Sequence, residues 1–203
     1  MIWKLLPIAI VAFLLGSPTA LAEVPGPISA IGCSNTRDAI QGYLKESVED
    51  RFVNTGQGGQ TMTKWELNSN SVPPWSNYLA LRPSSGFEAA WINMCARVNE
   101  PTMTEQQINT IIARIHVIDP GIPIYLSPLN FYVTESCVVT GGNTISNQGD
   151  VLADTMAGAS STDLLLRGPD LGPLALSQLV ADFCHPNKPG KALLGGQLVS
   201  YFD

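Results

Sequence analysis

The stretch that decides the fold is Pro-Ile-Ser-Ala-Ile-Gly-Cys-Ser-Asn-Thr, residues 27–36. Its first half is short and apolar and ends at Gly32, which predicts a buried strand opening into a tight turn. A helix should follow from about Thr36, because apolar residues recur there at helical spacing: Ile40, Tyr43, Leu44 and Val48. Ser34 therefore lies at a strand-to-helix turn. Free backbone N–H groups at such a turn favour a developing anion, although an ordinary helix N-cap has the same sequence signature.

Strand and helix signals alternate through the rest of the chain. Further strand candidates are residues 51–54, 87–94, 122–126 and 164–166. The best helix signal begins with the capping box at residues 104–107 and continues with isoleucines at helical spacing. Further helices are expected at residues 151–156, 173–181 and 191–201. This alternation predicts one α/β domain, a three-layer α/β/α sandwich with a mostly parallel sheet of about five strands.

Several connecting segments are expected to be loops. Residues 55–61 hold three glycines in four positions and lack the Gly-Lys-Ser/Thr ending of a phosphate loop. Residues 68–85 suggest a long surface excursion that folds over a cleft, and residues 133–159 are only weakly patterned. Ligands bind beyond the carboxyl ends of strands in such sheets, so Ser34, Gly59, residues 95–99 and the loop after Leu126 should lie near one cleft. Four aromatic residues could line it, although aromatic residues more often belong to the core: Trp75, Tyr78, Trp91 and Phe131.

Residues 1–22 have the pattern of a secretory signal peptide. Lys4 supplies the positive charge, an apolar run follows, and residues 20–22 form a small-x-small cleavage pattern. The run is too short for a membrane span, so an uncleaved anchor and a lipoprotein start at Cys33 are the less favoured alternatives. We expect cleavage after Ala22, a secreted or periplasmic location, and one domain over residues 23–203.

The composition limits the partners of the chain. It carries 11 Lys and Arg against 17 Asp and Glu, a net charge of −6, and no basic cluster is visible in the sequence. Nucleic acid and anionic membrane surfaces are therefore unexpected partners. No segment after the leader is apolar enough to be an integral membrane segment, and a monomer is expected. Two histidines and no Cys-x-x-Cys pair leave few ligands for zinc, so no cofactor is expected.

The cysteines and the second histidine add two further features. Four cysteines in an exported chain suggest two disulfides, with three pairings open. Asp182-Phe183-Cys184-His185-Pro186-Asn187 places a carboxylate three residues before His185, and Pro186 keeps the segment out of a continuous helix. An orienting acid beside an imidazole can make a general base, although a surface His–Asp pair has the same sequence. His116 is expected near a helix end, where it is more simply a solvated residue.

Together these blocks resemble the SGNH (GDSL-like) hydrolases, a superfamily of secreted esterases and lipases with a flavodoxin-like fold. The resemblance spans most of the mature chain. It assigns the nucleophile to Ser34 within residues 32–36, an oxyanion N–H to Gly59 within residues 54–59, and the acid and base to Asp182 and His185 within residues 182–190. On the sheet order usual for that fold, it also implies the disulfides Cys33–Cys95 and Cys137–Cys184.

The third family block, Gly-x-Asn-Asp, is altered here. At the usual spacing its asparagine, which donates to the oxyanion, is replaced by Arg97. A two-residue insertion would bring Asn99 into that role, and Asn93 is a third candidate inside the strand. We prefer Asn99, with Arg97 as the alternative. The aspartate that usually precedes the nucleophile is also missing, because Cys33 stands there.

The resemblance implies a secreted serine esterase that hydrolyses carboxylic (acyl or acetyl) esters through an acyl-enzyme. Carboxylesterase, lipase and carbohydrate acetylesterase all remain open, with a small-molecule, glycan or lipid ester as substrate. Ser34 would attack, His185 would take its proton, and Asp182 would hold the imidazole. The alternative is a non-catalytic glycan- or lipid-binding protein on the same fold, because fold alone does not fix function.

Overall fold

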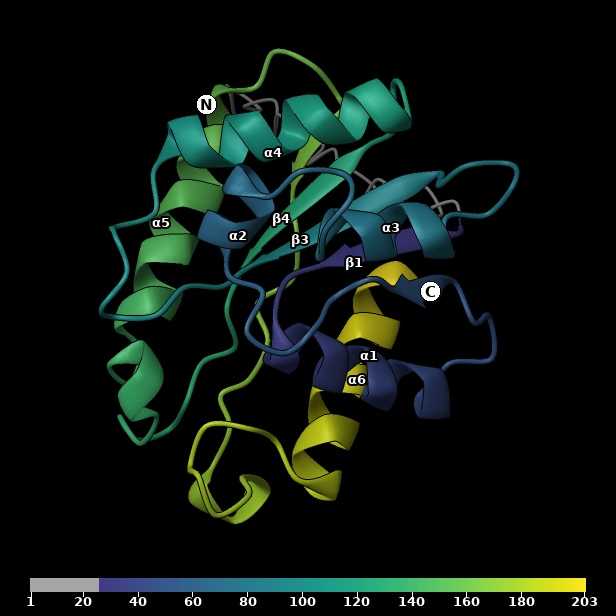
Figure 1. Ribbon diagram of the computed structural model, residues 1–203. Helices are drawn as coiled ribbons and strands as arrows, with labels where there is room; N and C mark the ends of the chain where they lie inside the picture. Colours follow the sequence, from purple (N-terminus) through teal and green to yellow (C-terminus); the bar gives the residue numbers. More distant parts are fainter. Residues whose placement is uncertain (1–25) are drawn as a thin grey trace, which may run out of the picture.

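The computed structural model describes residues 26–203, and the expected leader lies outside them. Its centre is a five-stranded sheet with every neighbouring pair parallel (Figure 1). The strands are β1 (Ile28–Ile31), β2 (Phe52–Asn54), β3 (Ala89–Met94), β4 (Ile124–Pro128) and β5 (Leu165–Arg167). Their order, β2-β1-β3-β4-β5, is that of a flavodoxin-like doubly wound sheet. The predicted fold class is confirmed.

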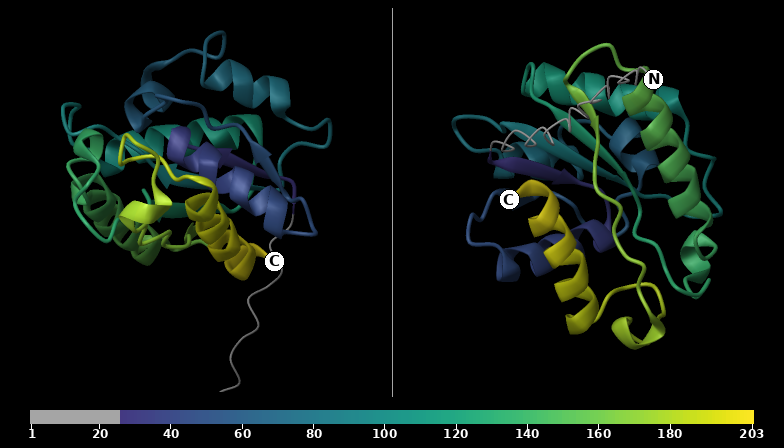
Figure 2. Two further views of the ribbon diagram at one scale, coloured as in Figure 1. Left: turned by 90° about the horizontal axis from the view of Figure 1, so that it is seen from below. Right: turned by 180° about the vertical axis from the view of Figure 1, so that it is seen from behind.

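Helices cover both faces of the sheet. One face carries α1 (Ser34–Glu46) and α6 (Lys188–Phe202), which lie side by side (Figure 2). The cluster of apolar side chains on the other face includes residues of α2 (Met62–Leu67), α3 (Trp75–Leu81), α4 (Glu105–Ile118) and α5 (Thr144–Ala159). Two single 3₁₀ turns complete the elements, η1 (Val138–Thr140) and η2 (Leu176–Gln178).

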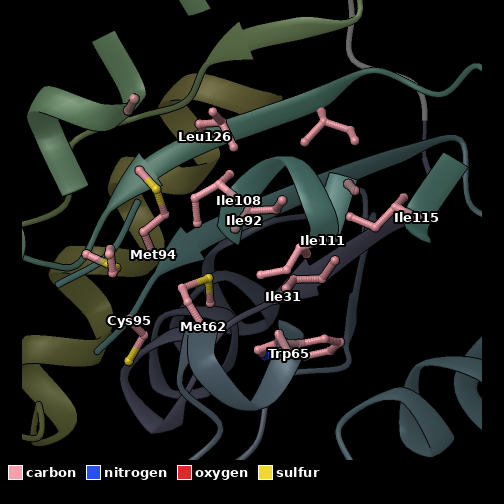
Figure 3. Close-up of a cluster of buried hydrophobic side chains, with 14 of the residues drawn as sticks. Ile31, Met62, Trp65, Ile92, Met94, Cys95, Ile108, Ile111, Ile115 and Leu126 are labelled. Carbon is pink, nitrogen blue, oxygen red and sulfur yellow. The ribbon is translucent and has the colours of Figure 1, made fainter. Parts of the chain in front are cut away.

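Buried aliphatic side chains between the sheet and α4 form one core (Figure 3). Isoleucines 108, 111 and 115 of α4 are fully buried against strand residues such as Ile92 and Leu126. Strands β1 and β3 are buried along their whole length and are apolar except for Ser29 and Asn93, as is typical of parallel sheets covered on both faces. The core fixes the strand ends from which the loops of the site project.

Helices α1 and α6 cross with their backbones in contact. A Cβ atom on Gly42 would lie 1.8 Å from the carbonyl oxygen of Lys191, and one on Gly195 would lie 2.2 Å from the carbonyl carbon of Gly42. Lys191 also pairs with the buried carboxylate of Asp38 at 2.8 Å. Since Ser34 begins α1 and His185 comes shortly before α6, this crossing sets the distance between the two segments.

Several sequence predictions about local structure were wrong. Residues 68–85 contain α3 with Trp75 and Tyr78 fully buried, and none of them lines the main cavity. Residues 133–159 contain the 16-residue α5 where only residues 151–156 were expected, because its apolar side packs into the core despite polar, glycine-containing sequence. Residues 173–181 form only the 3₁₀ turn η2, since Leu174 pairs with Tyr132 in a bridge instead of lying on a helix.

Two helix predictions need smaller corrections. Helix α1 begins at Ser34 and ends at Glu46, so Val48 lies beyond it and is 94% exposed. Leu44 lies within the helix but is 42% exposed. Neither belongs to the buried face that was expected of them. Helix α6 begins three residues earlier than expected, at Lys188, because Asn187 caps it by accepting a hydrogen bond from the N–H of Gly190 at 3.2 Å.

Candidate active site

The first part of the site is the turn from β1 into α1. Ser34 is the first residue of the helix, so its N–H lacks an acceptor within the helix. The hydroxyl of Thr36 accepts from the N–H of Cys33 at 3.0 Å and donates to Asn93 Oδ1 at 2.8 Å. Asn93 in turn donates through Nδ2 to the carbonyl of Pro128 at 2.5 Å. The turn is thereby tied to the ends of β3 and β4.

Gly32 is required by the closeness of this turn. A Cβ atom at Gly32 would lie 2.0 Å from Thr36 Oγ1 and 2.8 Å from the carbonyl oxygen of Asn93, and both are too close for any other residue. Its φ of 156° is also rarely adopted by L-residues. The glycine therefore lets the backbone before Ser34 pass directly over β3.

The second part of the site is the loop before α6. Ser34 Oγ lies 2.7 Å from His185 Nε2, and His185 Nδ1 lies 2.5 Å from Asp182 Oδ2. An N–H at Nδ1 donates to the carboxylate, which leaves Nε2 free to accept from the serine hydroxyl. The structure thus brings Ser34, His185 and Asp182 together in the order that proton transfer from the serine requires.

Asp182 is held as an anion. Its Oδ1 accepts from the backbone N–H groups of Cys184 at 2.9 Å and His185 at 3.0 Å, while Oδ2 faces the ring. Desolvation acts to raise the pKa of Asp182, but the two backbone hydrogen bonds and the imidazole together lower it to about 2. The geometry requires Phe183 to adopt a φ of 57°, which is unusual for a residue other than glycine.

Several bonds anchor this loop to neighbouring segments. Cys184 forms a disulfide with Cys137, and the buried hydroxyl of Tyr132 donates to the carbonyl of Cys184 at 2.9 Å. Burial raises the pKa of Tyr132 to about 12, so the hydroxyl stays protonated as a donor. Asn187 donates through Nδ2 to the carbonyls of Ser177 and Leu179. The acid and the imidazole remain open to solvent, with the Asp182 side chain 48% exposed and that of His185 37% exposed.

A cavity of about 800 Å³ opens at this place. It lies beyond the carboxyl ends of the strands, where the sheet order reverses between β1 and β3, as is general for doubly wound folds. Ser34 and His185 both line it. Its lining includes the apolar side chains of Leu129, Val138 and Val139, together with Gly58, Gly59 and Arg97.

The candidate oxyanion donors separate into two groups. Gly59, Asn99 and Arg97 line the cavity together with Ser34. Asn93 does not line it, because its side chain is 1% exposed and both ends of its amide are engaged, by Thr36 and Pro128. Asn93 is therefore a structural residue of the nucleophile turn.

The two disulfides are Cys33–Cys95 and Cys137–Cys184, the pairing that the resemblance implied. The first joins the nucleophile turn to the end of β3, and the second joins the His185 loop to η1. Residues 26–203 hold no group of three or more His, Cys, Asp or Glu side chains arranged to bind a metal ion. In the same range, no helix is long and apolar enough to cross a membrane.

Other residues singled out in the sequence lie away from the cavity. His116 Nε2 is 3.1 Å from the carbonyl oxygen of Ile122. Ile122 precedes β4, so it lies at the amino ends of the strands, away from the cavity at their carboxyl ends. Trp75, Tyr78 and Trp91 are fully buried in the core, and Phe131 does not line the cavity. The sequence reasoning missed Tyr132, because a lone tyrosine after a strand carries no local signal of a contact 52 residues away.

Neither protein-family models nor curated proteins match this chain. Among solved structures, it is similar to that of a "putative acylhydrolase" from Bacteroides fragilis NCTC 9343, with a TM-score of 0.53 and 14% sequence identity. The superposition covers 87% of this chain and 88% of that one. At this identity the likeness concerns the fold, so the two chains share a doubly wound α/β architecture over nearly their whole described length.

Proposed function

We propose that this protein is an exported serine hydrolase that cleaves carboxylic esters through an acyl-enzyme. The observation that carries the proposal is the chain of contacts from Ser34 Oγ to His185 Nε2 and from His185 Nδ1 to Asp182. A serine hydroxyl becomes a nucleophile when a base removes its proton, and this arrangement supplies the base and an anion to stabilise the imidazolium.

In the proposed reaction, Ser34 Oγ attacks the ester carbonyl carbon while its proton passes to His185. The tetrahedral oxyanion is held by the N–H groups of Ser34 and Gly59, with Asn99 as the preferred third donor. His185 then protonates the departing alcohol, and the acyl group stays on Ser34. A water molecule, deprotonated by His185, releases the carboxylic acid and restores the serine.

Further features support the proposal. The structural likeness is to a protein whose name describes an acylhydrolase. The apolar side chains that line the cavity suit an acyl chain, and the size of the cavity suits a short or medium chain. Two disulfides are expected where the chain is exported, in keeping with a signal peptide at residues 1–22.

The test is hydrolysis of p-nitrophenyl acetate, butyrate and octanoate by the mature protein, beside Ser34→Ala and His185→Ala. Each variant should lose about 10⁴-fold or more in kcat, because removing either group disables the same step. His116→Ala is the matched control, since His116 is the other histidine of the chain and lies away from the cavity. It should keep wild-type kcat.

Labelling separates the proposal from the binding-protein alternative. A fluorophosphonate should modify the wild type once, at Ser34, and leave Ser34→Ala unmodified. A wild type that hydrolyses none of the esters and takes up no label would contradict the proposal. The cavity would then be a binding site for a glycan or lipid.

A further inference from the structure

Cationic side chains lie at the cavity, and two of them, Arg97 and Lys64, converge on Gly59. A Cβ atom on Gly59 would lie 3.6 Å from Arg97 Nη2 and 3.9 Å from Lys64 Nζ, so both cations lie against the same glycine. Arg97 lines the cavity, and so does Arg37. The chain has only 11 Lys and Arg and a net charge of −6, so this cluster runs against its overall charge.

These cations have little neutralising charge from the protein. Within residues 26–203 neither Arg97 nor Lys64 makes an ion pair. The ion pair of Arg37 is with Asp38 at 3.9 Å, and that carboxylate is taken at 2.8 Å by Lys191. Arg37 Nε is buried and has no hydrogen-bond partner among the described residues.

The neighbouring carboxylates accept hydrogen bonds from neutral groups and, among the residues that the structure describes, form no ion pair with Arg97 or Lys64. Glu100 accepts from the hydroxyl of Thr61 at 3.1 Å and from the backbone N–H of Arg97 at 3.3 Å. Glu66 accepts from Gln107 at 2.9 Å. Like charges held close together repel, and a bound anion would reduce that repulsion.

The lining of the cavity combines apolar and cationic side chains with the candidate nucleophile Ser34. Val138, Val139 and Leu129 are apolar, and Arg97 and Arg37 are cationic. An ester consists of an acyl group and an alcohol. A cavity with both kinds of lining suits an ester whose acyl chain is apolar and whose alcohol carries a negative charge.

Resting on the proposed function, we infer that the substrate is an acyl ester of an anionic alcohol, whose carboxylate or phosphate is bound by Arg97, Lys64 and Arg37. Guanidinium groups bind such anions through paired hydrogen bonds, and an ammonium adds a point charge. Catalysis itself follows the steps given above, and the anion serves to position the alcohol.

The test uses three butyrate esters that differ only in the charge at the para position of a phenol. The alcohols are 4-hydroxybenzoate (anionic), 4-hydroxybenzamide (neutral) and 4-(trimethylammonio)phenol (cationic). For each enzyme, the quantity compared is kcat/KM for the anionic ester divided by kcat/KM for the neutral one. Comparing that ratio between enzymes cancels the intrinsic reactivity of the esters and any general effect of a substitution on the oxyanion.

Arg97→Gln and Lys64→Gln should each lower this ratio about fivefold at low ionic strength, and the double variant further. The value of kcat/KM for the cationic ester divided by that for the neutral ester should rise in the same variants. Lys45→Gln is the matched control, since Lys45 is an exposed cation in the last turn of α1, at the other end from Ser34. It should leave the ratio as in the wild type. An unchanged ratio in the double variant overturns the inference.

Binding of uncleavable analogues tests the anion site without depending on turnover. The amides 4-butyramidobenzoate and 4-butyramidobenzamide cannot be cleaved as esters, and their Kd values for Ser34→Ala can be measured by calorimetry. Tighter binding of the anionic amide, lost in Ser34→Ala/Arg97→Gln, supports the anion site even if no ester is hydrolysed. Equal binding of the two amides contradicts the anion site while leaving the proposed ester hydrolysis intact.

A final pair of substrates distinguishes two sources of the anion. Butyryl glycerol 3-phosphate represents a lipid headgroup, and an acetylated glucuronate represents an acidic sugar. The preferred one of the two should lose more activity in Arg97→Gln than p-nitrophenyl butyrate does. If neither shows a greater loss, the cations do not select the alcohol.

Discussion

The two segments that meet at the candidate site are stabilised in different ways. Ser34 begins a helix whose turn is fixed by Gly32, Thr36 and Asn93, all within the buried junction of β1, β3 and β4. Asp182 and His185 lie on an exposed loop that depends on a disulfide, the Tyr132 hydroxyl and the α6 cap. Buried hydrogen bonds and a close backbone approach therefore hold the nucleophile within the domain, whereas a few bonds hold the exposed loop that carries the base.

The largest expected effect concerns the more exposed segment. Asp182→Asn should keep the fold but lower kcat about 10⁴-fold, because an amide at this position no longer fixes the imidazole tautomer that accepts from Ser34. The measurement is kcat on p-nitrophenyl butyrate, with circular dichroism to verify folding. A fall of less than tenfold would mean that Asp182 does not orient the base.

Removing each disulfide in turn tests how far the nucleophile turn and the histidine loop depend on their cross-links. Closing loops of 47 and 62 residues should contribute about 4 kcal/mol each to the free energy of unfolding by the chain-entropy relation. The effects on activity should differ. Cys137→Ala/Cys184→Ala should lower kcat about tenfold at temperatures where the fold persists, since small displacements of a catalytic group are costly.

Cys33→Ala/Cys95→Ala should lower kcat much less, because Thr36 and Asn93 still hold the nucleophile turn. Thermal unfolding and kcat measured on both double variants test this comparison. An equal loss of kcat in the two would show that both segments depend on their disulfides to the same degree.

The helix crossing connects the two segments. Gly195→Ala places a methyl group 2.2 Å from the backbone of Gly42, so α1 and α6 must separate, at a cost of about 2–3 kcal/mol in the free energy of unfolding. Gly196→Ala is the control on the same helix. It meets no atom within 4 Å and should stabilise the protein by about 0.5–1 kcal/mol.

Urea unfolding measures both changes. The two variants should move in opposite directions, and kcat should fall only in Gly195→Ala. Equal stability of the two would show that the helices can adjust at no cost, and that the crossing does not set the separation of Ser34 and His185.

The smallest effect is on stability at acid pH. The folded-state pKa of Asp182 is about 2, below its ordinary value in an unfolded chain of about 4. A lowered pKa contributes stability above the unfolded value, and this contribution disappears as the pH falls from about 4 through 2. Because half of the side chain is exposed, the contribution should be less than about 1 kcal/mol.

Asp182→Asn should therefore lose slightly less stability than the wild type between pH 5 and pH 2.5, as measured by urea unfolding. Identical pH dependence in the two proteins would mean that the hydrogen bonds to Asp182 do not persist in solution.

The sequence predicted the sheet well because each strand carries its own signal. Residues 27–32, 87–94 and 122–126 are apolar runs bounded by turn residues, and such runs depend only on local chemistry. Helix α5 and the segment around η2 were mispredicted because tertiary contacts overrode local preference in both. The polar, glycine-containing α5 is helical because one side packs on the sheet, and Leu174 is extended because it pairs with Tyr132.

Some features of the candidate site could likewise be predicted from local sequence, and others depended on tertiary contacts. The sequence by itself determined the strand-to-helix turn at Ser34, the Asp182–His185 spacing and the resemblance that links them, since each is a short pattern along the chain. Only the tertiary structure decided that Asn93 supports the turn, that Tyr132 holds the histidine loop, and that Arg97 and Lys64 converge on Gly59 at the cavity. Those contacts join residues tens of positions apart, and their proximity follows from the order in which the strands pack.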